Sequence, residues 1–239
     1  MDKQIFVING SGGVGKDTFV ELFARNNPVG IKNYSSIERL KTFALSLGYK
    51  GSKTEKDRKF LSELKKLCNE YNDFTFNNIR DTVTAFKDDP AFGFLFIHIR
   101  EPEEIARVVQ EFDAKTILIT SNRVAPITSN DSDKRVADYS YDYIFSNNDS
   151  LEDFEEEIKS FRGSILANFI KKTIRVQCTS NEEMLKVEKL IHNQLVGNED
   201  YINSRICLNN SLNRKDNTEY RVNIVFFADC ETEPQLLIP

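Results

Sequence analysis

The sequence has no tryptophan and few residues of the kinds that cross-link a chain or bind structural metal ions. It has two histidines and four cysteines among 239 residues. The cysteines are far apart, and two histidines are too few to complete ligand sets with them, so neither a disulfide framework nor a structural zinc site is indicated. No apolar run approaches the roughly 18 residues that a membrane span needs, and the N-terminal run is too short for a signal peptide. We therefore expect a cytoplasmic protein without a membrane partner.

The charge balance is acidic. The chain carries 32 basic and 37 acidic residues, which gives a net charge of −5 and a pI of about 5.3. A dedicated binder of duplex nucleic acid usually carries a basic face, so this class is disfavoured. Any anionic ligand must be held by local positive groups. At roughly 150 residues per domain, the length predicts one or two domains.

Strand and helix patterns alternate over the first two thirds of the chain. The apolar run Ile5–Asn9 leads through a glycine-rich loop into helical spacing from Phe19. Further strands are predicted at 30–34, 92–99, 116–120 and 141–145, and further helices at 37–47, 50–71, 77–87, 102–112 and 151–161. The spacing Ser35-x-x-Glu38 predicts a capping box at the second helix. Alternation of this kind predicts an α/β fold with a parallel sheet.

The pattern changes after Arg162. A strand at 173–178 and a helix at 181–195 are followed by two strands near 205–209 and 219–227. We therefore predict an α/β domain over residues 1–162 and a small C-terminal α+β appendage, of βαββ type, over residues 163–239. The sequence predicts no role for the appendage.

Residues 10–18 have the pattern of a phosphate-binding P-loop, Gly-x-x-x-x-Gly-Lys. Its glycines let backbone N–H groups turn around phosphate oxygens, the following helix adds its dipole, and Lys16 neutralises the β- and γ-phosphates. The alternative is a glycine-rich turn without a ligand. The residues predicted to bind a nucleotide are Gly10, Ser11, Gly12, Gly13, Val14, Gly15, Lys16, Asp17 and Thr18.

One residue of this loop departs from the usual pattern. Asp17 occupies the position of the Ser or Thr whose hydroxyl ligates Mg²⁺, and the first threonine is Thr18. Metal coordination is therefore predicted to be altered or shifted, with Asp17 and Thr18 as candidate ligands.

The Gly-Lys-Asp-Thr sequence of the loop resembles phage-type deoxynucleoside monophosphate kinases and the adenylate-kinase-like P-loop kinases around them. Three further segments are similar to that family in order along the chain. In 97–105, Arg100 matches the arginine at a strand end, 121–123 begins a loop like the lid, and 141–151 is similar to the last strand and its asparagine-containing turn. The resemblance covers residues 1–161. It implies a three-layer P-loop NTPase fold of the nucleotide-kinase type.

The resemblance also implies a reaction, the transfer of the γ-phosphoryl group of ATP, with Mg²⁺, to a nucleoside or deoxynucleoside monophosphate. Such transfer depends on positioning and charge neutralisation. The predicted catalytic residues are Lys16, Arg100 and Arg123, and the predicted acceptor-binding residues are Arg58, Arg100 and Arg135. A plainer explanation stays open for each arginine, because salt bridges and solvated surface charges are common.

His98 stands where the resemblance would put the acidic residue that holds Mg²⁺ through water. Imidazole is a poor ligand for a hard cation, so Glu101 is the predicted substitute, with Glu104 as an alternative. If neither compensates, the protein is a weak kinase or a nucleotide-binding regulatory protein. A third reading is a kinase of another small phosphate ester, since animal-type phosphomevalonate kinases carry a similar Gly-Lys-Asp. The expected partners are small nucleotides, and a homodimer is compatible with the sequence.

Overall fold

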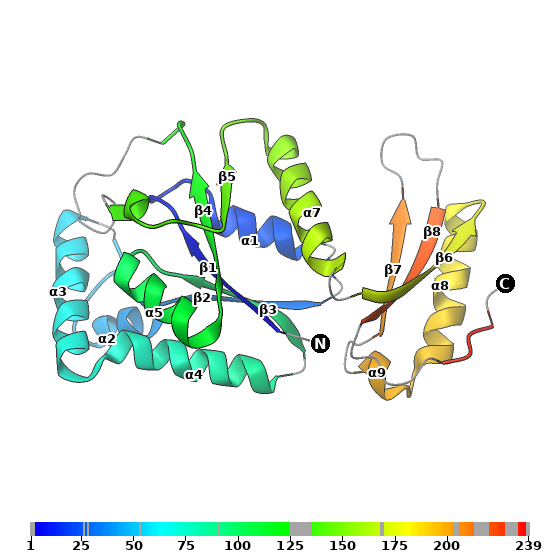
Figure 1. Cartoon of the computed structure of the whole chain (residues 1–239), viewed down its shortest axis with the longest axis horizontal. Helices are drawn as coiled ribbons and strands as arrows, with labels where there is room; N and C mark the ends of the chain where they lie inside the picture. The colour runs from blue at the N-terminus through cyan, green and yellow to red at the C-terminus, as the bar shows by residue number, and fades with distance from the viewer. Residues whose placement is uncertain are drawn as a thin grey trace. The chain divides into compact units, whose positions relative to one another are not determined.

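The computed structural model describes residues 3–25, 27, 29–52, 54–89, 91–124, 135–167, 170–202, 206–212, 220–227 and 234–237. The chain separates into two compact units (Figure 1). The larger unit consists of Lys3–Ala24 and Ile31–Ile158, and the smaller of Arg25–Gly30 and Lys159–Pro239.

The larger unit is built on a five-stranded sheet in the order β2-β3-β1-β4-β5. The strands are β1 (Gln4–Asn9), β2 (Gly30–Ser35), β3 (Phe92–His98), β4 (Lys115–Thr120) and β5 (Tyr143–Ser146). The central strand β1 pairs in parallel with β3 and β4, and β4 pairs in parallel with β5. The carboxyl ends of these four strands therefore meet at one edge of the sheet, and the glycine-rich loop follows β1 at this edge.

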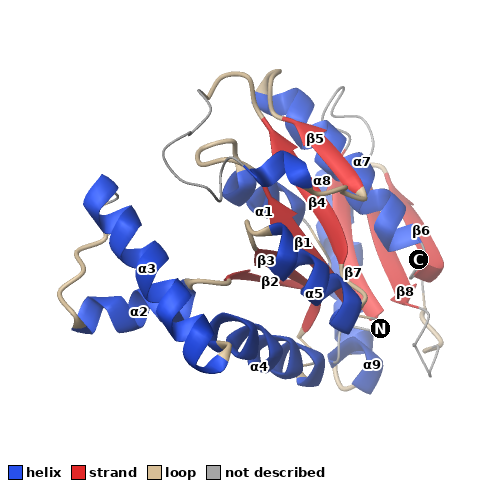
Figure 2. Cartoon of the chain, turned by 60° about the vertical axis from the view of Figure 1, so that its left-hand side comes forward, coloured by secondary structure: helices blue, strands red, loops and turns tan. Residues whose placement is uncertain are grey.

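Helices cover both faces of this sheet (Figure 2). They are α1 (Lys16–Ala24), α2 (Glu38–Ser46), α3 (Glu55–Asn72), α4 (Phe74–Asp88), α5 (Pro102–Phe112) and α7 (Leu151–Ala167). On one face, Phe19 of α1 packs against Phe154 of α7, with ring centroids 6.2 Å apart. On the other face, Ile79 of α4 and Ile105 of α5 share a buried cluster with the strands. The three-layer α/β fold with a parallel sheet predicted from the sequence is confirmed.

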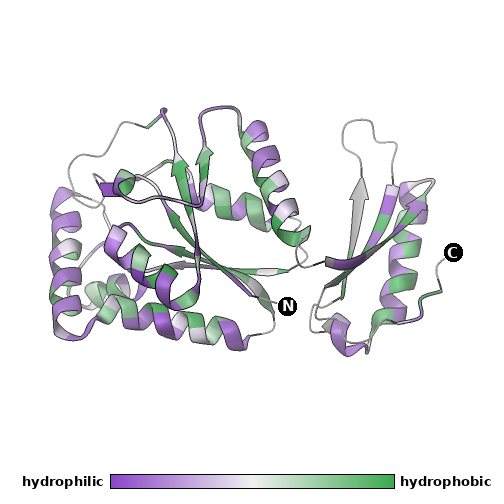
Figure 3. Cartoon of the chain, in the orientation of Figure 1, coloured by the Kyte–Doolittle hydropathy of each residue, from purple (hydrophilic) through white to green (hydrophobic). Residues whose placement is uncertain are grey.

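The apolar runs of the sequence supply the core of this unit. The strands β1, β3 and β4 are largely hydrophobic (Figure 3), and residues 93–97 of β3 are all buried. The aromatic rings of Phe6 and Phe96 stack 5.2 Å apart between neighbouring strands. A continuous apolar strand is needed here because both faces of the sheet are covered.

Helix α3 differs from the other helices of the larger unit. The structure describes all 18 of its residues, and none of them is buried. Leu67 is 64% exposed, although the apolar spacing of this segment predicts a face that packs against the core. Ion pairs of Lys65 with Glu101 and Glu104, at 2.7 and 2.9 Å, connect α3 to the start of α5. These ion pairs therefore help to hold α3 in place, because the helix buries little apolar surface.

In the smaller unit, one strand is followed by a helix, a short second helix and two more strands. Its strands β6 (Ile170–Cys178), β7 (Ile206–Leu212) and β8 (Tyr220–Phe227) form an antiparallel sheet in the order β6-β8-β7. Helix α8 (Asn181–Leu195) packs on this sheet, and the short helix α9 (Glu199–Ile202) follows it. The hydroxyl of Ser180 accepts a hydrogen bond from the backbone N–H of Glu183 and so caps α8.

Several predicted boundaries differ from the structure. The predicted capping box at Ser35 and Glu38 is wrong, because α2 begins at Glu38 and has no side-chain cap. The backbone N–H of Ser36 instead donates to the carbonyl of His98, so the chain is still bonded to the end of β3 at this point. Helix α7 continues six residues past the predicted end, Phe161, to Ala167. Within the described parts of the chain, no helix combines the length and apolarity needed to cross a bilayer.

Candidate functional site

The glycine-rich loop between β1 and α1 has a backbone that side chains would disrupt. Gly10, Gly13 and Gly15 have φ angles of 144°, 85° and 103°, which L-residues rarely adopt. A Cβ atom on Gly10 would lie 2.4 Å from the carbonyl oxygen of Ile119 in β4. On Gly15 it would lie 2.5 Å from the side-chain amide nitrogen of Asn147. The loop therefore passes close to the ends of β4 and β5, and glycine is required there.

Lys16 lies over this loop. Its Nζ atom donates hydrogen bonds to the carbonyl oxygens of Gly10, at 2.5 Å, and Ser11, at 2.8 Å. The backbone N–H of Phe19 donates to the carbonyl of Gly15, so the helix starts directly at the loop. The N-terminus of a helix favours anions, and the lysine adds a full positive charge beside it. Together these groups can hold a phosphate chain.

Asn147, in the turn after β5, supports the loop from the side. Its Nδ2 atom donates to the carbonyl oxygen of Val14 at 2.9 Å, and its backbone N–H donates to Thr120 at 2.8 Å. The turn after β5 and the end of β4 are thus bonded to each other, and the amide of Asn147 is bonded to the loop. This turn belongs to the segment 141–151 that resembles the nucleotide kinases, and the sequence predicted no role for Asn147.

Asn9, the last residue of β1, is completely buried and was missed by the sequence analysis. Its Oδ1 accepts from the backbone N–H of Gly10 at 2.7 Å. Its Nδ2 donates to the hydroxyl of Tyr141 at 2.6 Å and to the carbonyl of Arg100 at 3.3 Å. One amide therefore connects the loop, the end of β3 and the segment before β5. The signal in the sequence is a polar residue that ends an apolar strand directly before a glycine loop.

Tyr141 continues this network. Its hydroxyl donates to the carbonyl oxygen of Val136 at 2.8 Å. Val136 belongs to the short 3-10 helix η1 (Arg135–Asp138). Burial raises the pKa of Tyr141 to about 12, so its hydroxyl keeps the proton that this bond needs at neutral pH.

The two residues that depart from the usual pattern, Asp17 and His98, lie beside each other. The Nε2 atom of His98 is 3.8 Å from Oδ1 of Asp17 and 2.7 Å from Oδ1 of Asn33 in β2. Since an amide oxygen is an acceptor, Nε2 is the donor in the bond to Asn33. Burial lowers the pKa of His98 from 6.5 to about 4, so its imidazole is neutral at neutral pH.

Mg²⁺, which the family resemblance implies, fits these residues poorly. It prefers six oxygen ligands in octahedral geometry, and here the side chain facing Asp17 is an imidazole. The predicted substitutes Glu101 and Glu104 both form ion pairs with Lys65, whose positive charge opposes a second cation beside them. Thr18 is half-buried in the first turn of α1. No cluster of three His, Cys, Asp or Glu side chains able to hold a metal occurs in the described ranges.

The four predicted arginines lie in different places. Arg100 is half-buried just past the end of β3, and Arg58 is exposed on α3. The guanidinium of Arg123 donates to the carbonyl of Asp149 and, at 3.5 Å, to Oδ1 of Asn147. It thus shares Asn147 with the loop, while its roles and those of Arg100 and Arg58 stay predictions.

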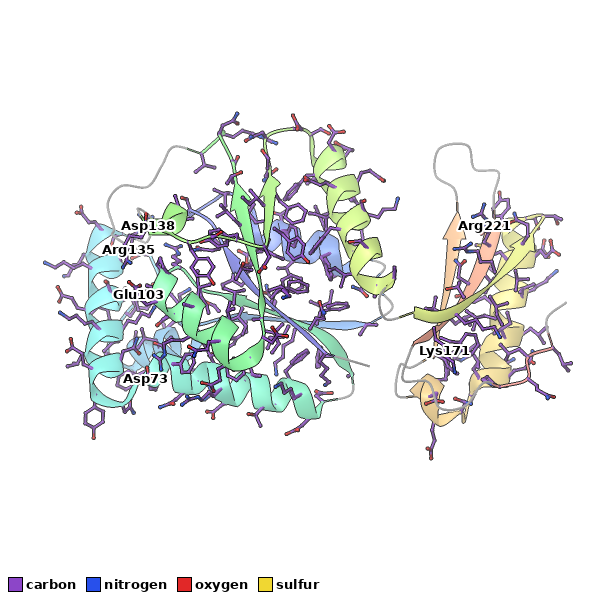
Figure 4. All side chains as sticks on the ribbon, in the orientation of Figure 1. Asp73, Glu103, Arg135, Asp138, Lys171 and Arg221 are labelled. Carbon is purple, nitrogen blue, oxygen red and sulfur yellow. The ribbon has the colours of Figure 1, made fainter. Side chains whose placement is uncertain are left out.

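Arg135 is paired with acidic side chains. Its guanidinium lies 2.5 Å from Glu103 of α5 and 3.5 Å from Asp138 (Figure 4). The loop that resembles the lid begins at 121–123, and residues 125–134, which follow it and precede Arg135, lie outside the described residues. An acceptor-binding role for Arg135 therefore also stays a prediction.

Comparison with known proteins gives limited similarity. No protein-family model matches the chain, and no curated protein matches it. It is similar to a shikimate kinase from Aquifex aeolicus, with 14% identity and a TM-score of 0.36, over 68% of this chain and 99% of that one. It is also similar to an inferred kinase from Chloroflexus aurantiacus, with 9% identity and a TM-score of 0.38, over 69% and 97%. Scores this low carry no functional argument. The parallel pairing and the strand order themselves define an α/β protein in which a glycine-rich loop follows the central strand.

Proposed function

We propose that this chain binds ATP at Gly10–Thr18 and transfers its γ-phosphoryl group to a nucleoside or deoxynucleoside monophosphate. The observation that carries the proposal is the geometry of the loop. Three glycines with positive φ turn the backbone, and Lys16 already bonds to the carbonyl oxygens of Gly10 and Ser11. This arrangement suits a chain of phosphates, because its N–H groups, helix N-terminus and lysine all favour negative charge.

Nucleotide binding breaks the hydrogen bonds between Lys16 and the carbonyl oxygens of the loop. The ammonium group exchanges two carbonyl oxygens for phosphate oxygens, and it follows the phosphoryl group as that group moves to the acceptor. No protein base is needed, because the acceptor phosphate is already anionic. The protein's contribution is to position two phosphate groups and to neutralise their charge.

Arginines are the residues suited to the acceptor side. Arg100 follows β3, which neighbours β1, so it stands at the sheet edge where open α/β folds bind ligands. Arg135 can exchange Glu103 for a phosphate at low cost, because solvent screens an ion pair as exposed as this one. Arg58 on α3 completes the acceptor-binding candidates, and Arg123 beside Asn147 is a further catalytic candidate.

A nucleotide-binding regulatory protein is the second candidate. The contact between Asp17 and His98 favours it, because both residues stand at positions that organise Mg²⁺ in active P-loop kinases. The two candidates share nucleotide binding and differ in turnover.

The test combines nucleotide binding with turnover. ATP affinity is measured by calorimetry, and ADP release is followed with a panel of nucleoside and deoxynucleoside monophosphates and with phosphomevalonate as a phosphate ester of another class. Lys16→Ala should weaken ATP binding and lower turnover at least 100-fold. Lys186→Ala, which removes an exposed lysine paired with Glu182, is the matched control and should change neither.

Each outcome decides between the candidates. Turnover with one of the nucleotides supports the proposed reaction, and turnover with phosphomevalonate alone changes the acceptor class. ATP binding without turnover supports the regulatory protein. If Lys16→Ala binds ATP as tightly as the wild type, the P-loop assignment is wrong.

A further inference from the structure

Two side-chain oxygen atoms lie near Nε2 of His98, at the end of β3. They are Oδ1 of Asp17, at the start of α1 after the glycine loop, and Oδ1 of Asn33 in β2. Nε2 of His98 is 2.7 Å from the amide oxygen and 3.8 Å from the carboxylate oxygen. Two ligand atoms that each lie about 2.1 Å from one ion are roughly 3.4 Å apart in tetrahedral coordination. The observed spacings lie on either side of this value, so small side-chain rotations suffice to share an ion.

The convergence is built into the fold. His98 and Asn33 belong to strands that neighbour each other in the sheet, and the backbone N–H of Ser36 donates to the carbonyl of His98, which keeps the ends of the two strands together. The His98 side chain is 15% exposed, whereas the Asp17 carboxylate is 84% exposed. Two ligands are therefore fixed by the sheet, and the third is free to adjust.

The kinds of donor atom decide which ion they suit. Imidazole nitrogen suits Zn²⁺, Co²⁺ and related transition cations, while Mg²⁺ demands oxygen ligands. The neutral form of an imidazole is the one that ligates metal ions. When the imidazole of His98 binds a cation through Nε2, its proton moves from Nε2 to Nδ1. The bond from the Nε2 lone pair to the cation then takes the place of the hydrogen bond to Asn33.

We propose that Asp17, His98 and Asn33 form a binding site for one divalent transition cation of the Zn²⁺ or Co²⁺ type. Water or another oxygen ligand completes the coordination. The site sits at the position where the family resemblance puts a Mg²⁺ site, and the imidazole changes its metal preference. Cation binding at this site requires neither nucleotide nor phosphoryl transfer, so it can be measured independently of the proposed reaction.

The test uses the full-length, reduced protein without nucleotide. Zn²⁺ alone is titrated by calorimetry, Co²⁺ alone is followed by its visible absorption, and Mg²⁺ alone serves for comparison. The wild type should bind one equivalent of Zn²⁺ at least 10-fold more tightly than Mg²⁺. Asp17→Asn and His98→Gln should each weaken Zn²⁺ binding at least 10-fold, and His98→Gln should remove the Co²⁺ absorption band of this site.

Two controls keep the result interpretable. His192→Gln removes the other histidine, which bonds to Tyr201 in the smaller unit, and it should leave the Zn²⁺ affinity unchanged. Asp17→Asn alters an exposed carboxylate, so its effect does not depend on folding even if His98→Gln is unstable. The proposal is overturned if Zn²⁺ affinity is unchanged in both site variants, or if the wild type binds Mg²⁺ as tightly as Zn²⁺. ATP binding is measured separately, so failure of one proposal leaves the other testable.

Discussion

The side-chain amide of Asn9 donates a hydrogen bond to the hydroxyl of Tyr141, with 2.6 Å between nitrogen and oxygen. The two residues are 132 positions apart in the sequence. The same hydroxyl donates onward to Val136, and the other end of the same amide accepts from the first residue of the glycine loop. The loop and the segment that carries Arg135 are therefore joined by three successive hydrogen bonds.

We predict that Tyr141→Phe destabilises the protein by about 1–3 kcal/mol, because it leaves the buried Asn9 amide and the Val136 carbonyl without this partner. Chemical denaturation measures the change. The matched variant Tyr139→Phe keeps the neighbouring ring, whose centroid is 5.2 Å from that of Tyr141, and should have a smaller effect. Equal effects of the two variants would argue against the network.

Gly10→Ala should destabilise the protein by about 2–4 kcal/mol, because its φ of 144° is strained for alanine and the new Cβ would meet the backbone of Ile119. Gly163→Ala is a useful comparison, since Gly163 lies in α7 and a Cβ there would meet nothing within 4 Å. The Gly163→Ala substitution should raise the free energy of unfolding by roughly 0.5–1 kcal/mol. Thermal unfolding of both variants tests the requirement for glycine at the loop.

Lys65→Met should destabilise the larger unit by about 2 kcal/mol, because Glu101 and Glu104 then lose the cation between them. Burial already raises the pKa of Glu104, and removal of Lys65 should raise it further. Lys66→Met removes a lysine that is 76% exposed and should cause no measurable change. Urea denaturation of the two variants at neutral pH makes the comparison, and similar results would mean that the ion pairs contribute little.

Arg100→Ala should lower kcat roughly 100-fold and change either KM less, if its charge is used mainly in the transition state. Steady-state kinetics with the preferred acceptor gives both constants. Arg80→Ala, which removes a guanidinium bound to Glu111 on the α4 surface, controls for the general loss of an arginine. A change in thermal stability with normal kinetics would show that Arg100 has a structural role.

Stability should fall as the pH drops from 6.5 to 4 because of His98. Burial lowers its pKa from 6.5 to about 4, so in this window the unfolded chain binds a proton that the folded chain does not. This difference in proton binding contributes up to about 3 kcal/mol to the free energy of unfolding. The contribution is fully present above pH 6.5 and is lost by pH 4. Denaturation of wild type and His98→Gln with a chelator present isolates the effect, since glutamine does not titrate. Parallel pH profiles for the two proteins would contradict the prediction.

The sequence predicted the elements of this protein better than the contacts between them. Period and composition located β3 and α5, because a continuous apolar run and an amphipathic helix each depend on local residues. The capping box at Ser35 failed because the next residue, Ser36, hydrogen-bonds to the end of β3, a partner 62 positions away. Only long-range pairing could reveal this bond.

In the candidate site, too, the sequence predicts local motifs better than contacts between distant residues. The loop Gly10–Thr18 was recognisable because the motif is local. The approach of Asn9 to Tyr141, and of Asn33 to His98, depends on strand order in the sheet, which a single sequence does not specify. The pairing of Glu101 with Lys65 likewise depends on how α3 packs against α5.

Helix α3 has a consequence for the dynamics of the larger unit. A segment whose 18 residues all keep some solvent exposure, as the structure describes them, has little apolar burial to lose when it opens. We expect its amide hydrogens to exchange with solvent through local opening, on a faster timescale than those of β1 and β3. Amides of these two buried strands should exchange only when the whole unit unfolds. The strands of the larger unit would then stay folded while α3 opens, and this opening must break the ion pairs of Lys65 with Glu101 and Glu104.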